Sequence, residues 1–428
     1  MPAAPPDPWP APRGPGPLAA VVPLPGSKSV TNRALVLAAL ADGTSRVGRP
    51  LRSRDTELMA AALRVLGCAV VDHDDGDWSV TGTTGRATGD RVDVGAAGTV
   101  ARFLPPVAAL VQGAVVLDGD PRIRERPLAP LLRALRDLGA DLSGVDALPV
   151  EVRGTGRLRG GEAVVDASSS SQLVSGLLLS GARFDRGLVL RHEGPPVPSA
   201  PHVAMTVEAL RGAGVDVDDA TPGTWAVAPG RLRPRDAAVE PDLSTAAAYL
   251  AAPLLTGGRV TVPDWPASTT QPGAQLPDLL TAMGARVERA GGGLTVAAGD
   301  RLQGADLDLS EVGELTPVLT ALAALADGPS RFRGVGHLRG HETDRLAALA
   351  TSLGALGADV REHDDGLEVR PRRLTGAVLD SLDDHRLAMA WAVLGLAVDG
   401  VQVRDVATTR KTVPDFTGSW ARMLAQVA

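Results

Sequence analysis

The 428-residue sequence contains a single cysteine, Cys68, which excludes an internal disulfide and is typical of a reducing compartment. Its apolar neighbours in LRVLGCAV indicate a buried structural thiol and not a nucleophile. No apolar run approaches the roughly 20 residues that a membrane helix needs. With a net charge of −7 and no basic tract, the chain carries no signal for binding nucleic acid or an anionic membrane. We therefore expect a cytoplasmic protein with neither kind of partner.

Lysine is almost absent. Of 43 basic residues only Lys28 and Lys411 are lysines, and there is one asparagine, Asn32, and one isoleucine, Ile123. A compact ammonium differs from a planar guanidinium in size, hydration and the ability to lose a proton. Because arginine replaces lysine almost everywhere else, Lys28 and Lys411 are candidates for functional sites where arginine cannot substitute. The alternative is that these two lysines are present by chance.

The length of the chain is too great for one ordinary core, so two or more domains are expected, and a hydrophobic content of 44% is ample to fill them. The first segment, Met1 to Pro17, is rich in Pro and Ala and has no basic start followed by an apolar stretch. It is predicted to be a flexible leader and not a signal peptide.

One pattern recurs six times along the chain: a polar cluster, an Ala/Leu-rich helical stretch, a Gly-bearing turn and a Val-rich strand. Equivalent positions are separated by 71, 72, 73, 70 and 71 residues, a period that chance does not readily produce. These positions are Lys28, Thr99, Ser171, Ser244, Glu314 and His385.

A second amphipathic helix closes five of the six units and ends at Gly before a strand. The sixth unit stops after WARMLAQVA, while an unassigned strand, LAAVVPL at 18–24, precedes the first. The simplest closure joins these ends, so that the terminal segment completes the last unit. The chain is then expected to form a discontinuous domain, 1–25 plus 240–428, and an inserted domain, 26–239, each with three mixed α/β units.

The polar cluster of every unit lies where a helix begins. Ser, Thr, Asp and Gly at such positions are ordinary helix caps. Helix N-termini also present free N–H groups and a partial positive charge, which suit anions. If these ends converge in a cleft between the domains, the cleft is predicted to bind anions.

Seven segments together resemble the enolpyruvyl transferases, in particular the shikimate branch of that family. They cover residues 24 to 416 in one order, and although AGT or SSQ alone is weak, the combination is highly specific. The segments are LPGSKSVTNRALVLAAL (24–40), AGTVARF (97–103), RERP (124–127), SSSSQ (168–172), HETDRL (341–346), DDHRLAMA (383–390) and RKTVPDF (410–416).

The resemblance implies an α/β fold of two globular domains, the six-repeat inside-out α/β barrel of these transferases, which close on substrate. It implies transfer of the enolpyruvyl group of phosphoenolpyruvate to the 5-hydroxyl of shikimate 3-phosphate, in aromatic amino acid biosynthesis, by an enzyme that is the target of glyphosate. The two substrates bring about five to six negative charges together, so several fixed cations are required. The 5-hydroxyl loses a proton while the enol carbon gains one, so a base and an acid are needed. No cofactor or metal is required, and we expect a monomer.

The resemblance also assigns roles to individual residues. Catalysis is expected of Glu314 as the base, Glu342 as the acid and Lys28 between the two substrates. Arg102 and Arg122 are expected nearby as additional charges. The residues expected to bind shikimate 3-phosphate are Lys28, Ser29, Arg33, Ser170, Ser171, Gln172, Ser199, Glu314 and His341. Those expected to bind phosphoenolpyruvate are Lys28, Gly98, Arg126, Gln172, Arg345, His385, Arg386 and Lys411. Arg345 is placed on the same helical face as Glu342 because three residues separate them.

The chain departs from the family pattern at several of these positions. Ala96 stands where the family has Asn, which removes a side-chain contact, and Glu314 stands where the best-known members have Asp. His341 replaces the usual Lys, His337 replaces an upstream Asn and His202 replaces a Tyr of many members. A neutral imidazole adds no charge, so the contacts to shikimate 3-phosphate are in doubt at these histidines.

Two alternatives stay open. The UDP-N-acetylglucosamine enolpyruvyl transferases share the scaffold, but their first signature resembles GxKN where this chain has GSKSVTNR, and their loop cysteine is missing near 113–124. A non-catalytic scaffold that binds phosphorylated ligands is the second alternative. A P-loop is excluded because Ser27, and not glycine, directly precedes Lys28 and the G-x-x-x-x-G-K frame is absent.

Overall fold

The computed structural model describes residues 5–83 and 85–428. It divides into two compact units, Met1–Pro25 with Glu240–Ala428 and Gly26–Val239, here called the discontinuous and the inserted unit. Within the described residues, no helix combines the length and apolar character that crossing a membrane requires.

The inserted unit contains helices and strands in regular alternation. Its elements are α1 (Lys28–Leu40), β3 (Thr44–Gly48), α2 (Arg54–Val65), β4 (Ala69–Asp72), β5 (Trp78–Thr81), β6 (Arg91–Asp93), α3 (Gly98–Ala109), β7 (Gln112–Asp118), α4 (Pro121–Arg124), α5 (Ala129–Asp137), β8 (Asp141–Leu142), β9 (Val150–Thr155), β10 (Gly161–Val165), α6 (Gln172–Gly181), β11 (Leu188–His192), α7 (Pro201–Gly212), β12 (Val217–Asp218), β13 (Thr224–Val227) and β14 (Ala237–Ala238).

The discontinuous unit has the same alternation with four short 3₁₀ helices, labelled η, among its described residues. Its elements are β1 (Trp9–Pro10), β2 (Leu18–Val21), α8 (Ala246–Thr256), β15 (Gly258–Val262), η1 (Pro272–Gln275), α9 (Leu276–Ala282), β16 (Arg286–Ala290), β17 (Gly293–Ala297), β18 (Asp306–Asp308), η2 (Gly313–Leu315), α10 (Thr316–Ala323), β19 (Ser330–Arg333), η3 (Gly336–Gly340), α11 (Arg345–Ala355), β20 (Asp359–His363), β21 (Gly366–Arg370), β22 (Val378–Asp380), α12 (His385–Gly395), β23 (Gln402–Arg404), η4 (Val406–Lys411) and α13 (Phe416–Leu424).

One sheet topology recurs in both units. In β6-β7-β9-β8, β6 pairs in parallel with β7, while β7 with β9 and β9 with β8 are antiparallel. The parallel pair is joined by α3, as a crossover connection requires. The same order of pairings occurs in β14-β3-β5-β4, β10-β11-β13-β12, β18-β19-β21-β20 and β2-β15-β17-β16, and β22-β23-β1 is a three-stranded version. The predicted repeat of six mixed units is therefore confirmed.

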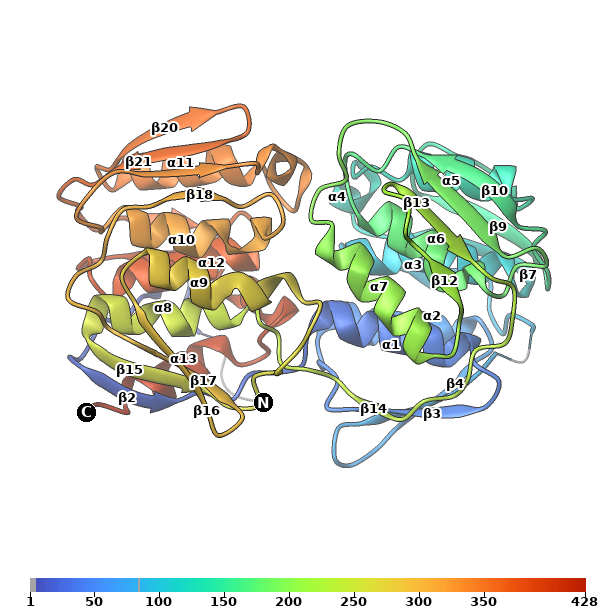
Figure 1. Ribbon diagram of the computed structural model, residues 1–428, viewed down its shortest axis with the longest axis horizontal. Coiled ribbons are helices and arrows are strands. Elements are labelled where there is room, and N and C mark those ends of the chain that lie inside the picture. The colour runs from blue at the N-terminus through green and yellow to red at the C-terminus, as the bar shows by residue number, and fades with distance from the viewer. Residues whose placement is uncertain (1–4, 84) are drawn as a thin grey trace. The chain divides into compact units, whose positions relative to one another are not determined.

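The first helix of each repeat is buried on nearly all sides. In the inserted unit α1, α3 and α6 contact one another, and in the discontinuous unit α8, α10 and α12 do so. Figure 1 shows the latter three between the β15–β17 strands and the β20–β21 hairpin. All eleven residues of α12 are buried, from His385 to Gly395. Helices that are apolar all round form the centre of a core, and here their beginnings carry the polar residues.

The two chain ends meet, as expected: Leu18 bridges Val427, and the N–H of Ala19 donates to the Gln426 carbonyl. Strand 18–24 nevertheless does not complete the sixth unit, because β2 pairs in parallel with β15 and is the first strand of the fourth unit. The sixth unit is completed by α13 and by β1, which pairs antiparallel with β23.

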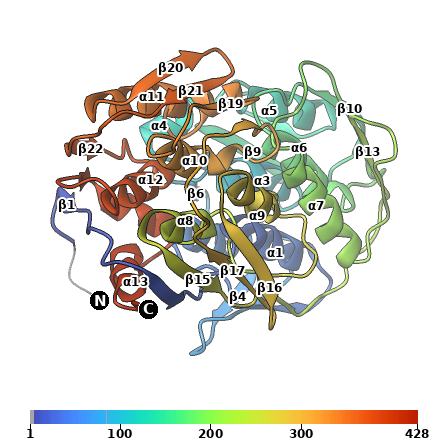
Figure 2. The ribbon, with the colours of Figure 1, turned by 60° about the vertical axis from the view of Figure 1, so that its left-hand side comes forward.

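The segment expected to be a flexible leader is instead packed from residue 9 onward; residues 1–4 lie outside the described residues. Trp9 is buried, and its ring packs edge-on against that of Phe416 with 6.3 Å between the ring centroids. The backbone N–H groups of Ala11 and Gly14 donate to Val401 and Leu396. Figure 2 shows β1 beside α12 and α13. Burial of an indole and these backbone hydrogen bonds offset the entropy of ordering a segment already stiffened by proline.

Cys68 lies in the core of the inserted unit, as predicted. Burial raises the pKa of its thiol to about 12, so the thiolate is disfavoured at neutral pH. The side chain packs as a small hydrophobe.

Candidate functional site

Lys28 is the first residue of α1, and its ammonium is paired with a carboxylate. Its Nζ lies 3.2 Å from Oδ2 of Asp55, the second residue of α2. The Asp55 side chain is buried and that of Lys28 is partly so. This pairing was not predicted, because 27 residues separate the two in sequence. It fixes the ammonium at the helix start while leaving further N–H donors for a ligand.

Arg33 lies one turn further along α1 and is fully buried. Its guanidinium donates to the Thr206 hydroxyl at 2.7 Å, the Ser175 hydroxyl at 3.2 Å and the carbonyls of His202 and Ser29 at 2.9 and 3.0 Å. These contacts tie α1 to α6 and α7. Arg33 therefore supports the helix starts, and its contact with shikimate 3-phosphate stays a prediction.

Gly98 begins α3 at the meeting point of three side chains. A Cβ at this position would lie 2.8 Å from Arg102 Nη1, 3.0 Å from Arg126 Nη2 and 3.0 Å from Gln172 Oε1. Arg102 donates to Gln172 Oε1 at 2.9 Å and to the Pro127 carbonyl. Only glycine lets these three side chains lie so close to the backbone. The start of α3 therefore exposes backbone N–H groups beside the guanidinium groups of Arg102 and Arg126.

One buried donor and one buried acceptor near this surface have no hydrogen-bond partner among the described residues. Nε of Arg126 is buried and has no hydrogen-bond partner among the described residues, and its Nη1 lies 3.5 Å from the Ala96 carbonyl. Oδ1 of Asn32 is likewise buried and without a partner there, while its amide nitrogen donates to the Thr99 hydroxyl at 2.6 Å. Buried polar atoms are rarely left unsatisfied, so Arg126 Nε is available to donate to a ligand and Asn32 Oδ1 to accept from one.

The serines of the third unit lie at the start of α6, as predicted. Ser171 is the N-cap, and the Ser170 hydroxyl accepts from the backbone N–H of Gln172 at 3.3 Å. Ser199 precedes α7 with a φ of +50°, an uncommon conformation for a residue with a side chain, and is buried. Strain of this kind occurs at ligand sites. His202 accepts from Arg33 through its carbonyl, so its backbone supports the site.

Arg345 is the centre of the corresponding region in the discontinuous unit. It is the first residue of α11 and is fully buried. Its Nε donates to Asp384 at 2.7 Å, Nη2 to Glu342 at 3.0 Å and Nη1 to His341 Nδ1 at 3.1 Å. Burial acts to lower the pKa of the guanidinium, but the carboxylates of Asp384, Glu342 and Glu314 outweigh burial and raise that pKa.

The contact between Glu342 and Arg345 exists, but its predicted geometry is wrong. Glu342 lies before the helix, which begins at Arg345, so the two do not share a helical face. The N-cap is Asp344, whose carboxylate accepts from the backbone N–H of Ala347 at 3.0 Å. Because Asp344 is the N-cap, the helix begins at Arg345. The bend before Asp344 places the Glu342 carboxylate against the Arg345 guanidinium.

Glu314 lies in η2, directly before α10, and is close enough to Arg345 to affect its pKa. His337 lies in η3, and its ring centroid is 5.6 Å from that of His341. Since Arg345 donates to Nδ1 of His341, that imidazole accepts there and is neutral in this arrangement. Both predicted proton-transfer carboxylates thus belong to one charge network around Arg345.

His385 and Arg386 begin α12, as predicted, and both are buried. Asp384 caps this helix by accepting from the Arg386 backbone N–H at 2.8 Å. The Arg386 guanidinium lies 4.0 Å from Asp242, and within the described part of the chain its buried Nε has no hydrogen-bond partner. Asp384 thus links Arg345 and α12. An aspartate directly before His385 is a typical helix N-cap, so the sequence could have indicated that Asp384 belongs to the site.

Lys411 is the last residue of η4, and its Nζ donates to the carbonyl of Asp383 at 2.6 Å and to the carboxylate of Asp383 at 3.0 Å. Leu382 and Asp383 have φ values of +52° and +57°, so two consecutive left-handed residues form this turn. Lys28 and Lys411 belong to different units, so their convergence on one ligand stays a prediction.

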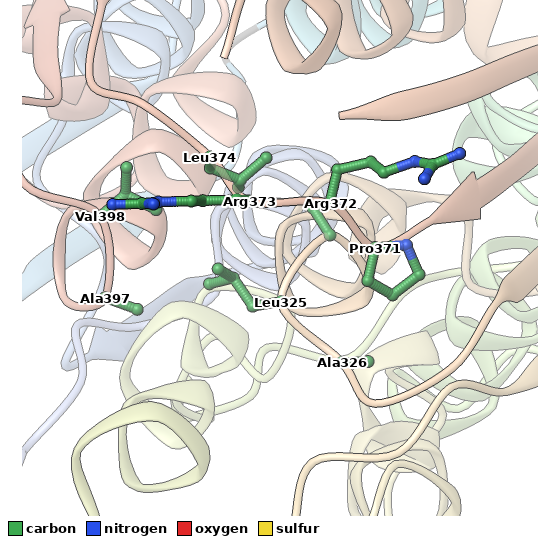
Figure 3. A pocket seen from close by; sticks show the side chains of 9 residues that line it. Leu325, Ala326, Pro371, Arg372, Arg373, Leu374, Ala397 and Val398 are labelled. Atoms are coloured by element: carbon green, nitrogen blue, oxygen red, sulfur yellow. The ribbon is translucent and has the colours of Figure 1, made fainter. Parts of the chain in front are cut away.

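A hollow of about 500 Å³ in the discontinuous unit is not this site. Figure 3 shows it lined by Leu325 and Val398, at the C-terminal ends of α10 and α12, with Arg372 and Arg373 on the loop after β21. The C-terminal ends of α10 and α12 carry a partial negative charge, and the two arginines compensate it. The negative helix ends disfavour an anion in this hollow. Among the described residues no group of His, Cys, Asp and Glu has the arrangement of a metal site.

Comparison with known proteins decides the family. Residues 12–420 match the family model of EPSP synthase (3-phosphoshikimate 1-carboxyvinyltransferase). The chain belongs to the EPSP synthase family. A 3-phosphoshikimate 1-carboxyvinyltransferase from Kocuria rhizophila is 52% identical to it, covering 97% of this chain and 96% of the relative.

Solved structures agree on the fold. The EPSP synthase of Acinetobacter baumannii superposes with a TM-score of 0.79 at 24% identity, covering 96% of this chain and 97% of that one. The enolpyruvyl transferase NikO of Streptomyces tendae gives a TM-score of 0.75 at 23% identity, covering 96% of each chain. The predicted family, fold class, enzyme class and place in the shikimate pathway are therefore confirmed, and the UDP-N-acetylglucosamine alternative is not favoured.

Proposed function

We propose that this EPSP synthase family member transfers the enolpyruvyl group of phosphoenolpyruvate to the 5-hydroxyl of shikimate 3-phosphate through the residues described above. The observation that carries the proposal is the network around Arg345. Two carboxylates suited to opposite proton transfers, Glu314 and Glu342, act on one buried guanidinium. A site that only bound phosphorylated ligands would gain nothing from carboxylates placed among its cations.

The inserted unit supplies groups that hold anions. Lys28 presents an ammonium between the two substrates, and Gly98, Arg126 and Gln172 form a surface for phosphoenolpyruvate. Ser170, Ser171 and Ser199, with Ser29, hold shikimate 3-phosphate. Fixed cations and hydroxyls of this kind place two polyanions side by side and stabilise the charge of the tetrahedral intermediate.

The discontinuous unit supplies the proton transfers. Glu314 takes the proton of the 5-hydroxyl of shikimate 3-phosphate while the oxygen of that hydroxyl forms a bond to C2 of phosphoenolpyruvate. Glu342 gives a proton to C3, and Arg345, Arg386, His385 and Lys411 hold the phosphoenolpyruvate carboxylate and phosphate. Loss of a proton from C3 and departure of phosphate then complete the transfer. The proposal requires both units to bind the same pair of substrates.

The decisive experiment is release of inorganic phosphate by the purified chain. Phosphoenolpyruvate with shikimate 3-phosphate should give turnover, and phosphoenolpyruvate with UDP-N-acetylglucosamine should give none. Turnover with the second acceptor alone would overturn the assignment. Binding of both substrates with no phosphate release would instead support a scaffold.

We further propose a monomeric, cytoplasmic enzyme. The support for the compartment is the single reduced thiol of Cys68. Size-exclusion chromatography with light scattering tests the monomer, and a mass of two chains would contradict it.

A further inference from the structure

The imidazole of His337 lies directly against the backbone that carries Glu314. A Cβ at Gly313 would lie 2.8 Å from Nε2 and 3.1 Å from Cε1 of His337. Glycine at 313 therefore allows the ring to approach η2 more closely than any other residue would. The ring edge that faces η2 is the one bearing Nε2.

Nε2 is buried and has no hydrogen-bond partner in residues 5–83 and 85–428. The ring also makes a hydrogen bond to the backbone of Gly334. With Nε2 unpartnered, Nδ1 is the nitrogen left to contact the Gly334 backbone, and in the neutral ring protonated at Nδ1 the lone pair is on Nε2. A buried lone pair with no donor is costly, which points to a proton that arrives during the reaction.

Burial, more than the neighbouring charges, favours the neutral ring before the reaction. Burial lowers the pKa of His337, the Glu314 carboxylate opposes this, and the Arg345 guanidinium acts with burial. The neighbouring His341 ring accepts from Arg345 and adds no charge in that arrangement. The groups facing His337 are thus one carboxylate, one guanidinium and one neutral imidazole.

We propose that His337 is a positioning residue for Glu314 and receives the proton that Glu314 removes from the 5-hydroxyl. The inference rests on the function proposed above. The O–H bond of the 5-hydroxyl breaks as an O–H bond forms on Glu314. That bond breaks in turn as Nε2 of His337 gains the hydrogen, which leaves a carboxylate and an imidazolium. The imidazolium returns its proton to water when products leave.

The consequence is a base that regains its charge without waiting for solvent. A protonated Glu314 would lose its favourable interaction with the Arg345 guanidinium. Once the proton has passed to His337, the Glu314 carboxylate is again negative and is attracted by two positive groups, the guanidinium and the imidazolium. Packing alone would also explain a histidine here, so the test must use a quantity that packing does not change.

The first test is the pH dependence of turnover in His337→Asn, which keeps a polar side chain that cannot titrate. At neutral pH kcat should fall about tenfold while both KM values stay within about twofold, since removal of an acid–base group acts on the chemical step. The acid limb of kcat/KM should move to lower pH by about one unit, because His337 no longer has to be neutral.

The matched control is His363→Asn, on β20 and in contact with Glu368 at 3.8 Å, which should leave the profile unchanged. An acid limb in His337→Asn that coincides with wild type would overturn the proposal.

The second test does not use activity. The pKa of His337, followed by NMR of the substrate-free protein, should fall in Glu314→Gln because the opposing carboxylate is removed. The control Glu288→Gln, an exposed residue of β16, should not change it. An unchanged pKa in Glu314→Gln would refute the coupling even if His337→Asn failed to fold. Absence of turnover in wild type would refute the proposed function and leave this titration to be judged separately.

Discussion

The two units are built alike and carry different chemistry. Each has three small mixed sheets and three buried helices whose beginnings hold the polar residues. In the inserted unit those beginnings carry an ammonium, two guanidinium groups and serine hydroxyls, with Asp55 as counter-ion to Lys28. In the discontinuous unit Glu314 lies directly before the buried helix α10, while Glu342 and Arg345 lie at the start of α11, a different helix of the same unit. The comparison shows that one scaffold presents different side chains in its two copies: cations and hydroxyls in the inserted unit, and carboxylates together with cations in the discontinuous unit.

The largest effect is expected from Glu342→Gln in the discontinuous unit. Turnover should fall about a thousandfold, because the amide cannot protonate C3, while phosphoenolpyruvate binding by calorimetry changes little. Glu288→Gln is the control and should retain full turnover. Wild-type turnover in Glu342→Gln would remove it as the acid, and the two units would no longer differ in the way described.

A smaller effect is expected from Trp9→Ala, which tests the strand that only the discontinuous unit receives from the start of the chain. Loss of the buried indole should destabilise the protein by about 3 kcal/mol in chemical unfolding. Pro10→Ala, the exposed neighbour in β1, should have little effect. Equal stability of both variants would show that the segment does not pack as described.

Gly98→Ala tests the anion-binding surface of the inserted unit. The added methyl would lie 2.8 Å from Arg102 Nη1 and 3.0 Å from Arg126 and Gln172, so KM for phosphoenolpyruvate should rise about tenfold and the protein should lose about 1 kcal/mol of stability as these side chains move. Gly144→Ala is the control, because no atom lies within 4 Å of a Cβ there. An unaltered KM would show that the ligand does not approach Gly98.

The smallest effect concerns Cys68 in the core of the inserted unit. Because burial raises the pKa of its thiol to about 12, the thiolate is scarce at pH 8 and alkylation of the native protein should be negligible over hours. Denaturant should restore full labelling. Rapid labelling of the native protein, followed by mass spectrometry, would mean that the core of this unit opens readily.

Some predictions made from the sequence stay untested. The binding roles of individual residues, the monomeric state and the cytoplasmic location stay predictions, because they depend on bound ligands or on solution behaviour. His337 shows why resemblance alone is insufficient there: burial lowers its pKa and the Glu314 carboxylate raises it, and neither follows from the HETDRL motif.

By itself, the sequence determined the six-unit repeat, the helix that each motif begins and the family to which the chain belongs. These are local properties, since a cap, an apolar helix and a Gly-ended turn follow from neighbouring residues. Only the tertiary structure decided that Trp9 is packed, that β2 joins the fourth unit and that Asp55 pairs with Lys28. Each of these results from contacts between segments distant in the chain, where packing and charge pairing outweigh local preference.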